Sequence, residues 1–118
     1  MQRGEIWLVD LDPAQGSEAN KQRPAVIVSN DRANSSATAL GRGVVTVVPV
    51  TSNVASIYPF QVLLPAERTG LTVDSKAQAE QIRPISVGRL RHRLGRLPAE
   101  ELTQLDDALR LHLELCSG

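Results

Sequence analysis

The chain has 118 residues, 42% of them hydrophobic, which is enough for one compact core but not for two, so we expect a single domain spanning 1–118. Thirteen basic and thirteen acidic side chains cancel, which argues against a protein that coats nucleic acid by bulk charge. One cysteine excludes an intrachain disulfide framework, and no stretch approaches the roughly 18 apolar residues of a membrane span, so we expect a cytoplasmic protein.

Short runs rich in Val, Ile and Leu, bounded by Pro, Gly, Ser and Asn, predict β-strands along most of the chain. In chain order the runs cover 5–11, 25–29, 44–49 and 61–64, followed by an alternating segment at 76–82 and a further candidate at 92–97. The stretches 12–22 and 30–43 are polar and rich in small residues, and we expect loops there. Short strands at this spacing predict a compact, curled antiparallel sheet.

Only the C-terminal part has a clear helical period. Leu102, Leu105, Leu109 and Leu113 recur at three-and-four spacing, which predicts a helix packed on the sheet. Pro98 suits its first position, and the glutamates that follow favour the positive end of the helix dipole. A shorter helical turn is expected after Ser86, a possible N-cap.

Few side chains in this sequence are suited to metal or nucleophilic chemistry. His92 and His112 lie twenty positions apart, and the cysteine, Cys116, is close to the C-terminus, so no zinc-ligand spacing is present and no cofactor is implied. A pair of catalytic histidines is disfavoured, because His112 lies in the apolar period of the helix and His92 among arginines. The segment 82–99 carries five arginines and no acid, which indicates either a solvated surface or a face for phosphate or an acidic partner.

The pair Arg23-Pro24 directly precedes the apolar run 25–29. Proline biases the preceding residue towards an extended backbone, so the guanidinium is expected to project from the mouth of a strand, where it is suited to phosphate. The alternative is a surface ion pair between Arg23 and Glu18.

Several motifs with consistent spacing resemble the MazF/PemK toxins. They are Arg3-Gly4-Glu5-Ile6-Trp7, Asp10-Leu11-Asp12-Pro13, Gly16-Ser17-Glu18, Arg23-Pro24, Ser29-Asn30-Asp31, Val48-Pro49-Val50-Thr51-Ser52 and Glu80-Gln81-Ile82-Arg83. The resemblance covers essentially the whole chain. It implies an α+β, mainly β fold, an SH3-like curled antiparallel barrel of five to seven strands with a C-terminal helix, and a homodimer whose interface forms an RNA groove.

The resemblance also implies a reaction. Such toxins are metal-independent, sequence-specific endoribonucleases that cleave single-stranded RNA through attack of the ribose 2′-hydroxyl, leaving a 2′,3′-cyclic phosphate and a 5′-hydroxyl. By resemblance the catalytic pair is Arg23 and Thr51, with Glu18 as candidate base or as a residue that positions Arg23. The positions that match RNA contacts in the family are Ser17, Ser52, Ser75, Lys76, Glu80 and Gln81.

The implied partner is an antitoxin of the MazE type, whose acidic tail would occupy the RNA groove; the basic run from Arg89 to Arg96 is a candidate receptor for it. Two other functions stay open. One is a non-catalytic toxin of the CcdB type, which shares this barrel and inhibits DNA gyrase by binding; the other is a plain SH3-like binding module. Arg23-Pro24 together with Thr51 favours the nuclease.

Overall fold

The computed structural model describes residues 1–11 and 22–115 of the chain. Within these ranges seven strands and three α-helices alternate with two short 3-10 turns. The strands are β1 (Glu5–Asp10), β2 (Gln22–Ile27), β3 (Val44–Thr51), β4 (Gln61–Leu64), β5 (Ser75–Gln78), β6 (Arg83–Ser86) and β7 (Leu90–Arg96). The helices are α1 (Asp31–Leu40), α2 (Ala66–Thr69) and α3 (Ala99–Leu113), and the turns are η1 (Ala79–Gln81) and η2 (Val87–Arg89).

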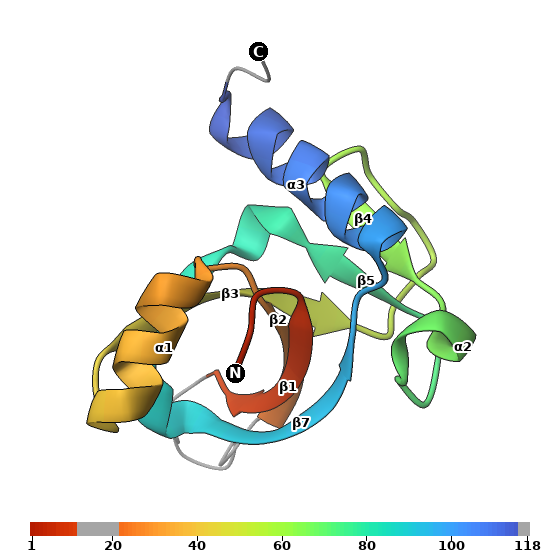
Figure 1. Ribbon diagram of the computed structural model, residues 1–118. Coiled ribbons are helices and arrows are strands. Elements are labelled where there is room, and N and C mark those ends of the chain that lie inside the picture. Colours follow the sequence, from red (N-terminus) through yellow and green to blue (C-terminus); the bar gives the residue numbers. More distant parts are fainter. Residues whose placement is uncertain (12–21, 116–118) are drawn as a thin grey trace, which may run out of the picture.

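The strands form one strongly curled antiparallel sheet (Figure 1), in the order β4-β5-β3-β2-β1-β7, with β6 attached to β3. The expected α+β fold with a curled antiparallel sheet and a C-terminal helix is therefore confirmed. Among the described residues β4 and β7 do not pair with each other, so the sheet curls without closing into a complete barrel.

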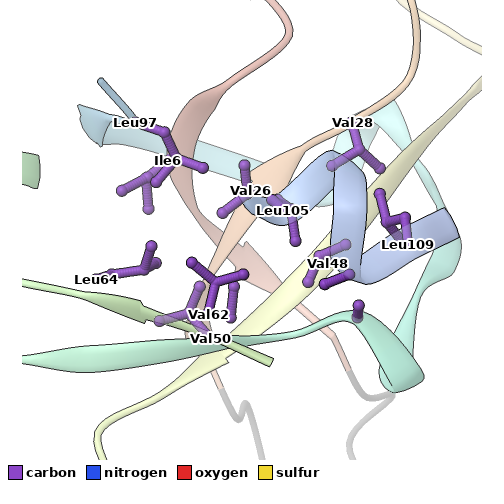
Figure 2. Packing of buried hydrophobic residues seen from close by; sticks show 13 residues of the cluster. Ile6, Val26, Val28, Val48, Val50, Val62, Leu64, Leu97, Leu105 and Leu109 are labelled. Carbon is purple, nitrogen blue, oxygen red and sulfur yellow. The ribbon is translucent and has the colours of Figure 1, made fainter. Parts of the chain in front are cut away.

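The middle parts of β2 and β3 are buried on both faces, which explains their apolar sequences. Val26 and Val48 face a cluster that includes Leu105 of α3, whereas Ile27 and Val47 face a second cluster on the opposite side of the sheet. Figure 2 shows the first cluster, with the leucines of α3 among the strand residues. The middle of the sheet is therefore fixed from both sides.

Pro49 lies where β3 changes its neighbour. Up to Val47 the strand pairs with β6, and from Val50 it pairs with β5. A proline lacks the backbone N–H that a ladder requires, so it fits the gap between the two pairings. This change of partner leads the last residue of β3, Thr51, towards β5.

The expectation of a loop over 30–43 was wrong, because α1 occupies most of this stretch. Asn30 caps the helix by accepting the N–H of Ala33 at 2.8 Å, and Gly41 ends it with φ at +65°. The helix buries only Asn34 and Ala37, so it has no apolar stripe that a periodicity argument could detect. Its two caps were the available signal.

Three other expectations need smaller corrections. The predicted strand 76–82 is strand only up to Gln78 and then forms η1. Pro98 caps α3 instead of starting it, and His112 and Leu113 at its far end are exposed. The turn after Ser86 is confirmed as η2, and among the described residues no helix has the length and apolar character that crossing a bilayer requires.

Candidate functional site

Arg23 and Thr51 lie on the two central strands, near the point where the β2–β3 ladder stops. Ala25 pairs with Pro49 and Val26 with Val48, and the same antiparallel register continued by two residues brings Arg23 opposite Thr51. Residues two apart on a strand share a face. The sheet therefore brings together two residues that are 28 positions apart in the sequence.

Both side chains line one hollow of about 440 Å³. Its floor is formed by the ends of β2 and β3, and its wall by the segment that follows α2 together with Leu94 of β7; the remaining lining residues are Pro24, Val50, Ser52, Gly70, Leu71, Thr72, Val73 and Ser75. The volume lies within the range of small-ligand sites. Arg23 is exposed and Thr51 is half-buried, so both are accessible from the hollow.

The hydroxyl of Thr51 is oriented by its own chain. Its Oγ1 accepts the backbone N–H of Asn53 at 3.2 Å, and Asn53 Oδ1 accepts the N–H of Ala55 at 3.2 Å. A hydroxyl that already accepts one hydrogen bond still has its proton to donate. Thr51 is therefore prepared to donate a hydrogen bond into the hollow.

A backbone-to-backbone contact holds the wall of the hollow in place. Gly70 has φ at +87°, and a Cβ on Gly95 of β7 would lie 1.9 Å from the carbonyl oxygen of Thr69. No side chain fits at either position, so the turn after α2 rests directly on β7.

An ion pair between α2 and α3 supports the same turn. Arg68 donates to both carboxylate oxygens of the buried Glu101, from Nε at 2.6 Å and from Nη2 at 2.9 Å. These hydrogen bonds lower the pKa of Glu101, against the desolvation that burial imposes. Bidentate geometry fixes the orientation of Arg68 as well as its distance, and α2 is thereby locked onto α3.

A second hollow, of about 300 Å³, lies on the other side of Arg23. It is more polar than the first, because most of its lining side chains carry an amide or a guanidinium: Leu11, Arg23, Pro49, Gln78, Gln81 and Arg83. Arg23 lines both hollows and thus stands between them.

Only some of the other predicted site residues line one of the two hollows. Ser52 and Ser75 line the first hollow and Gln81 the second, although the Ser75 hydroxyl donates to the carbonyl of Val73 at 3.0 Å. Lys76 and Glu80 line neither of these hollows. Ser17 and Glu18 lie outside the described residues.

Lys76 and Glu80 instead hold the chain that follows Thr51. The buried ammonium of Lys76 donates to the carbonyl of Ser56 at 2.6 Å, and Glu80 Oε2 accepts from the Gln61 amide at 2.7 Å. Both side chains therefore make contacts within the protein: Lys76 of β5 binds the loop before β4, and Glu80 of η1 binds the first residue of β4.

The basic run is largely occupied by contacts within the chain. Arg91 forms an ion pair with the Asp10 carboxylate, Arg89 donates to the Asp10 carbonyl at 3.1 Å, and Arg93 lies 3.5 Å from a Glu5 oxygen. The hydrogen bond from Arg91 lowers the pKa of Asp10. Much of this positive charge therefore fastens β7 to β1.

No local sequence pattern marks the wall residues Leu71, Val73 and Leu94, or Gln78 of the second hollow. They reach the site only through α2, the Gly70 turn and the β5 pairing. Gly70 alone carried a signal, as a glycine directly after a short helical stretch.

Comparison with known proteins places these features in context. A model of the PemK-like, MazF-like toxins of type II toxin–antitoxin systems matches residues 2–113. The chain is 72% identical over 117 residues to "Endoribonuclease MazF9" of Mycobacterium tuberculosis (strain ATCC 25618 / H37Rv), covering 99% of both proteins.

Two solved structures have a similar fold. MazF from Deinococcus radiodurans is 28% identical, with a TM-score of 0.75 and coverage of 97% of this chain and 96% of that one. An endoribonuclease in complex with its cognate antitoxin, from a mycobacterial species, is 22% identical, with a TM-score of 0.75 and coverage of 100% and 99%.

Proposed function

Given that the chain belongs to the PemK-like, MazF-like toxins of type II toxin–antitoxin systems, we propose that it is an endoribonuclease that cleaves single-stranded RNA without a metal ion. The observation that carries the proposal is the 72% identity to an endoribonuclease over 99% of the chain. The shared hollow of Arg23 and Thr51 supports it from the side of the chemistry.

The proposed reaction uses the nucleophile that RNA itself carries. The ribose 2′-oxygen attacks the adjacent phosphorus while the bond from phosphorus to the 5′-oxygen breaks, which leaves a 2′,3′-cyclic phosphate and a 5′-hydroxyl. The 2′-hydroxyl proton passes to a base, and the leaving 5′-oxygen takes up a proton. Since the attacking group is internal, no metal-bound water is required to supply it.

Arg23 and Thr51 have unequal parts in this step. A guanidinium stays protonated in proteins, so Arg23 clamps the phosphoryl oxygens on which charge develops. Thr51 adds a hydrogen bond from the hydroxyl that Asn53 orients. A preorganised donor of this kind contributes about 3 kcal/mol of transition-state stabilisation.

Glu18 is proposed as the base that accepts the 2′-hydroxyl proton, with positioning of Arg23 as its alternative role. The two roles differ in their pH dependence, because only a base must lose its proton before the reaction. Single-turnover rates of Glu18→Gln relative to the parent protein decide between them. A rate ratio that stays constant across pH excludes the base role.

The remaining RNA-binding residues are proposed to act in two ways, some by lining the hollows and others through the segments that they hold or belong to. Ser52 and Ser75 lie in the hollow of Arg23, and Gln81 in the neighbouring one. Lys76 and Glu80 are proposed to act on RNA through the loop that they hold, and Ser17 through the segment that precedes Arg23.

A toxin of this family requires an antitoxin, so we propose a MazE-like partner and a homodimer as the active form. We also propose that it acts on RNA in the cytoplasm. Leu111 of α3 and Leu115, just after the helix, are exposed at 57% and 58% and line one hollow, so this apolar pair is consistent with a further protein contact.

The test is to incubate the purified protein with RNA in excess chelator and to map the fragment ends. We expect cyclic-phosphate ends. Arg23→Ala is expected to slow single-turnover cleavage about 100-fold, whereas Arg32→Ala, an exposed arginine on α1, serves as the matched control and leaves the rate unchanged. Intact RNA combined with inhibition of DNA gyrase would overturn the proposal in favour of the CcdB-type function.

A further inference from the structure

Arg23 separates two hollows of different chemistry, and this arrangement bears on how the site selects RNA. The hollows measure about 440 Å³ and about 300 Å³, and Arg23 lines both. A phosphate held by Arg23 fills only a small part of either one. Each therefore has room for a further group of the substrate, and in RNA the groups on the two sides of a phosphate are nucleosides.

The first hollow has an apolar wall without aromatic rings. Leu71, Val73 and Leu94 line it. Of the two hydroxyls beside them, those of Thr72 and Ser75, the Ser75 hydroxyl donates its hydrogen bond to the Val73 carbonyl. Such a wall distinguishes bases by size and not by hydrogen bonding. It is also rigid, because the Gly70–Gly95 contact leaves no space for the turn to move inwards.

The second hollow has the opposite character. Gln78 and Gln81 each present an amide, which offers both a donor and an acceptor. Glutamine pairs with the N6 and N7 atoms of adenine. Unstacked bases in single-stranded RNA expose these edges. The set of donors and acceptors therefore suits a purine.

We propose that the two hollows are separate base subsites on either side of the scissile phosphate, one selecting by shape and the other reading a purine edge. The inference rests on the proposed ribonuclease function and deepens it. It makes Val73 and Gln81 specificity-determining residues at two different positions of the RNA, with Arg23 at the boundary between them.

The experiment measures cleavage of short RNAs in which each base beside the cleaved bond is varied in turn. Val73→Phe narrows the first hollow, with Val44→Phe as control, since Val44 and Val73 are similarly exposed at 60% and 53%. Gln81→Leu removes the amide from the second hollow, with Gln104→Leu on the exposed side of α3 as control. Thr72→Leu and Gln78→Leu are second variants for the two hollows.

Val73→Phe is expected to shift the preference between large and small bases about ten-fold at one position. Gln81→Leu is expected to reduce the purine preference about ten-fold at the other position. Both controls should keep the parent profile. Where a variant cleaves too slowly, its affinity for RNA with a 2′-deoxy nucleotide at the cleaved bond gives the same preferences without chemistry.

Two results overturn the proposal. One is that both variants change the base preference at the same RNA position; the other is that neither variant changes the base preference, in cleavage or in affinity. Failure of the parent protein to cleave any RNA is a different result, because it removes the proposed function itself.

Discussion

Gly95→Ala tests whether the wall of the first hollow, which Arg23 and Thr51 line, depends on the backbone contact between β7 and the turn after α2. The new Cβ would lie 1.9 Å from the Thr69 carbonyl oxygen, 3.0 Å from its carbon and 3.3 Å from the Gly70 Cα. Favourable contacts between carbon atoms require about 3.5 Å, so one backbone segment must move by more than about 1 Å. Overpacking of this kind costs typically 1–3 kcal/mol, and because all three atoms belong to the backbone we expect about 3 kcal/mol.

Urea unfolding followed by the fluorescence of the single tryptophan measures this cost. With a slope of about 2 kcal/mol per M, the unfolding midpoint should fall by about 1.5 M urea. Gly88→Ala is the control, because its Cβ would meet nothing closer than the Ser86 Oγ at 3.9 Å, and its midpoint should stay close to the parent value. Equal midpoints for the two variants would refute the contact.

Leu105→Ala, at a fully buried position of α3, should lower the free energy of unfolding by about 3 kcal/mol, measured in the same urea assay. Asn34→Ala removes an amide that donates to the Ser29 carbonyl at 2.9 Å, and we expect a loss of about 2 kcal/mol because buried groups lose their partners. The pKa of Asp10 is lower in the folded protein than in the unfolded chain, so the unfolded chain binds the proton first as pH falls. The Asp10 carboxylate therefore contributes its full stabilisation above the ordinary pKa of 3.8, and this contribution is lost as pH falls through the folded pKa. Asp10→Asn should therefore flatten the fall of the urea midpoint between about pH 5 and 3, and a curve parallel to the parent's contradicts this assignment. Arg91→Glu, which places a like charge beside Asp10, should lower the urea midpoint, whereas Arg96→Glu should keep it and weaken antitoxin binding in a titration.

The strands could be predicted because their apolar runs reflect burial on both faces. The runs 25–27 and 45–48 lie in the two central strands, where core contacts on each side favour valine and isoleucine. Helix α1 lacked such a signal, because it is held by its caps and by the buried amide of Asn34 instead of an apolar stripe. The predictable elements are therefore those whose stability comes from hydrophobic burial.

The candidate site could be predicted only in part, for a related reason. Arg23 was recognisable beside Pro24, and Thr51 followed from the family resemblance, but their juxtaposition depends on the β2–β3 register. The wall depends on a contact between Gly70 and Gly95, which are 25 positions apart in the sequence. A glycine required by a distant backbone has no local pattern, because what it provides is the absence of a side chain.

The position of the site follows from the same arrangement. Strands β2 and β3 are clamped between two cores, and the side chains proposed for catalysis stand just where their mutual ladder ends. A catalytic donor contributes most when it is held in place before the reaction, since no reorganisation is then required as charge develops. The opposite side of the hollow is built from a turn that rests on β7 through two glycines and on α3 through one ion pair. Changes in that turn are therefore expected to alter which base is accepted, and changes at the strand ends to alter how fast the phosphate reacts.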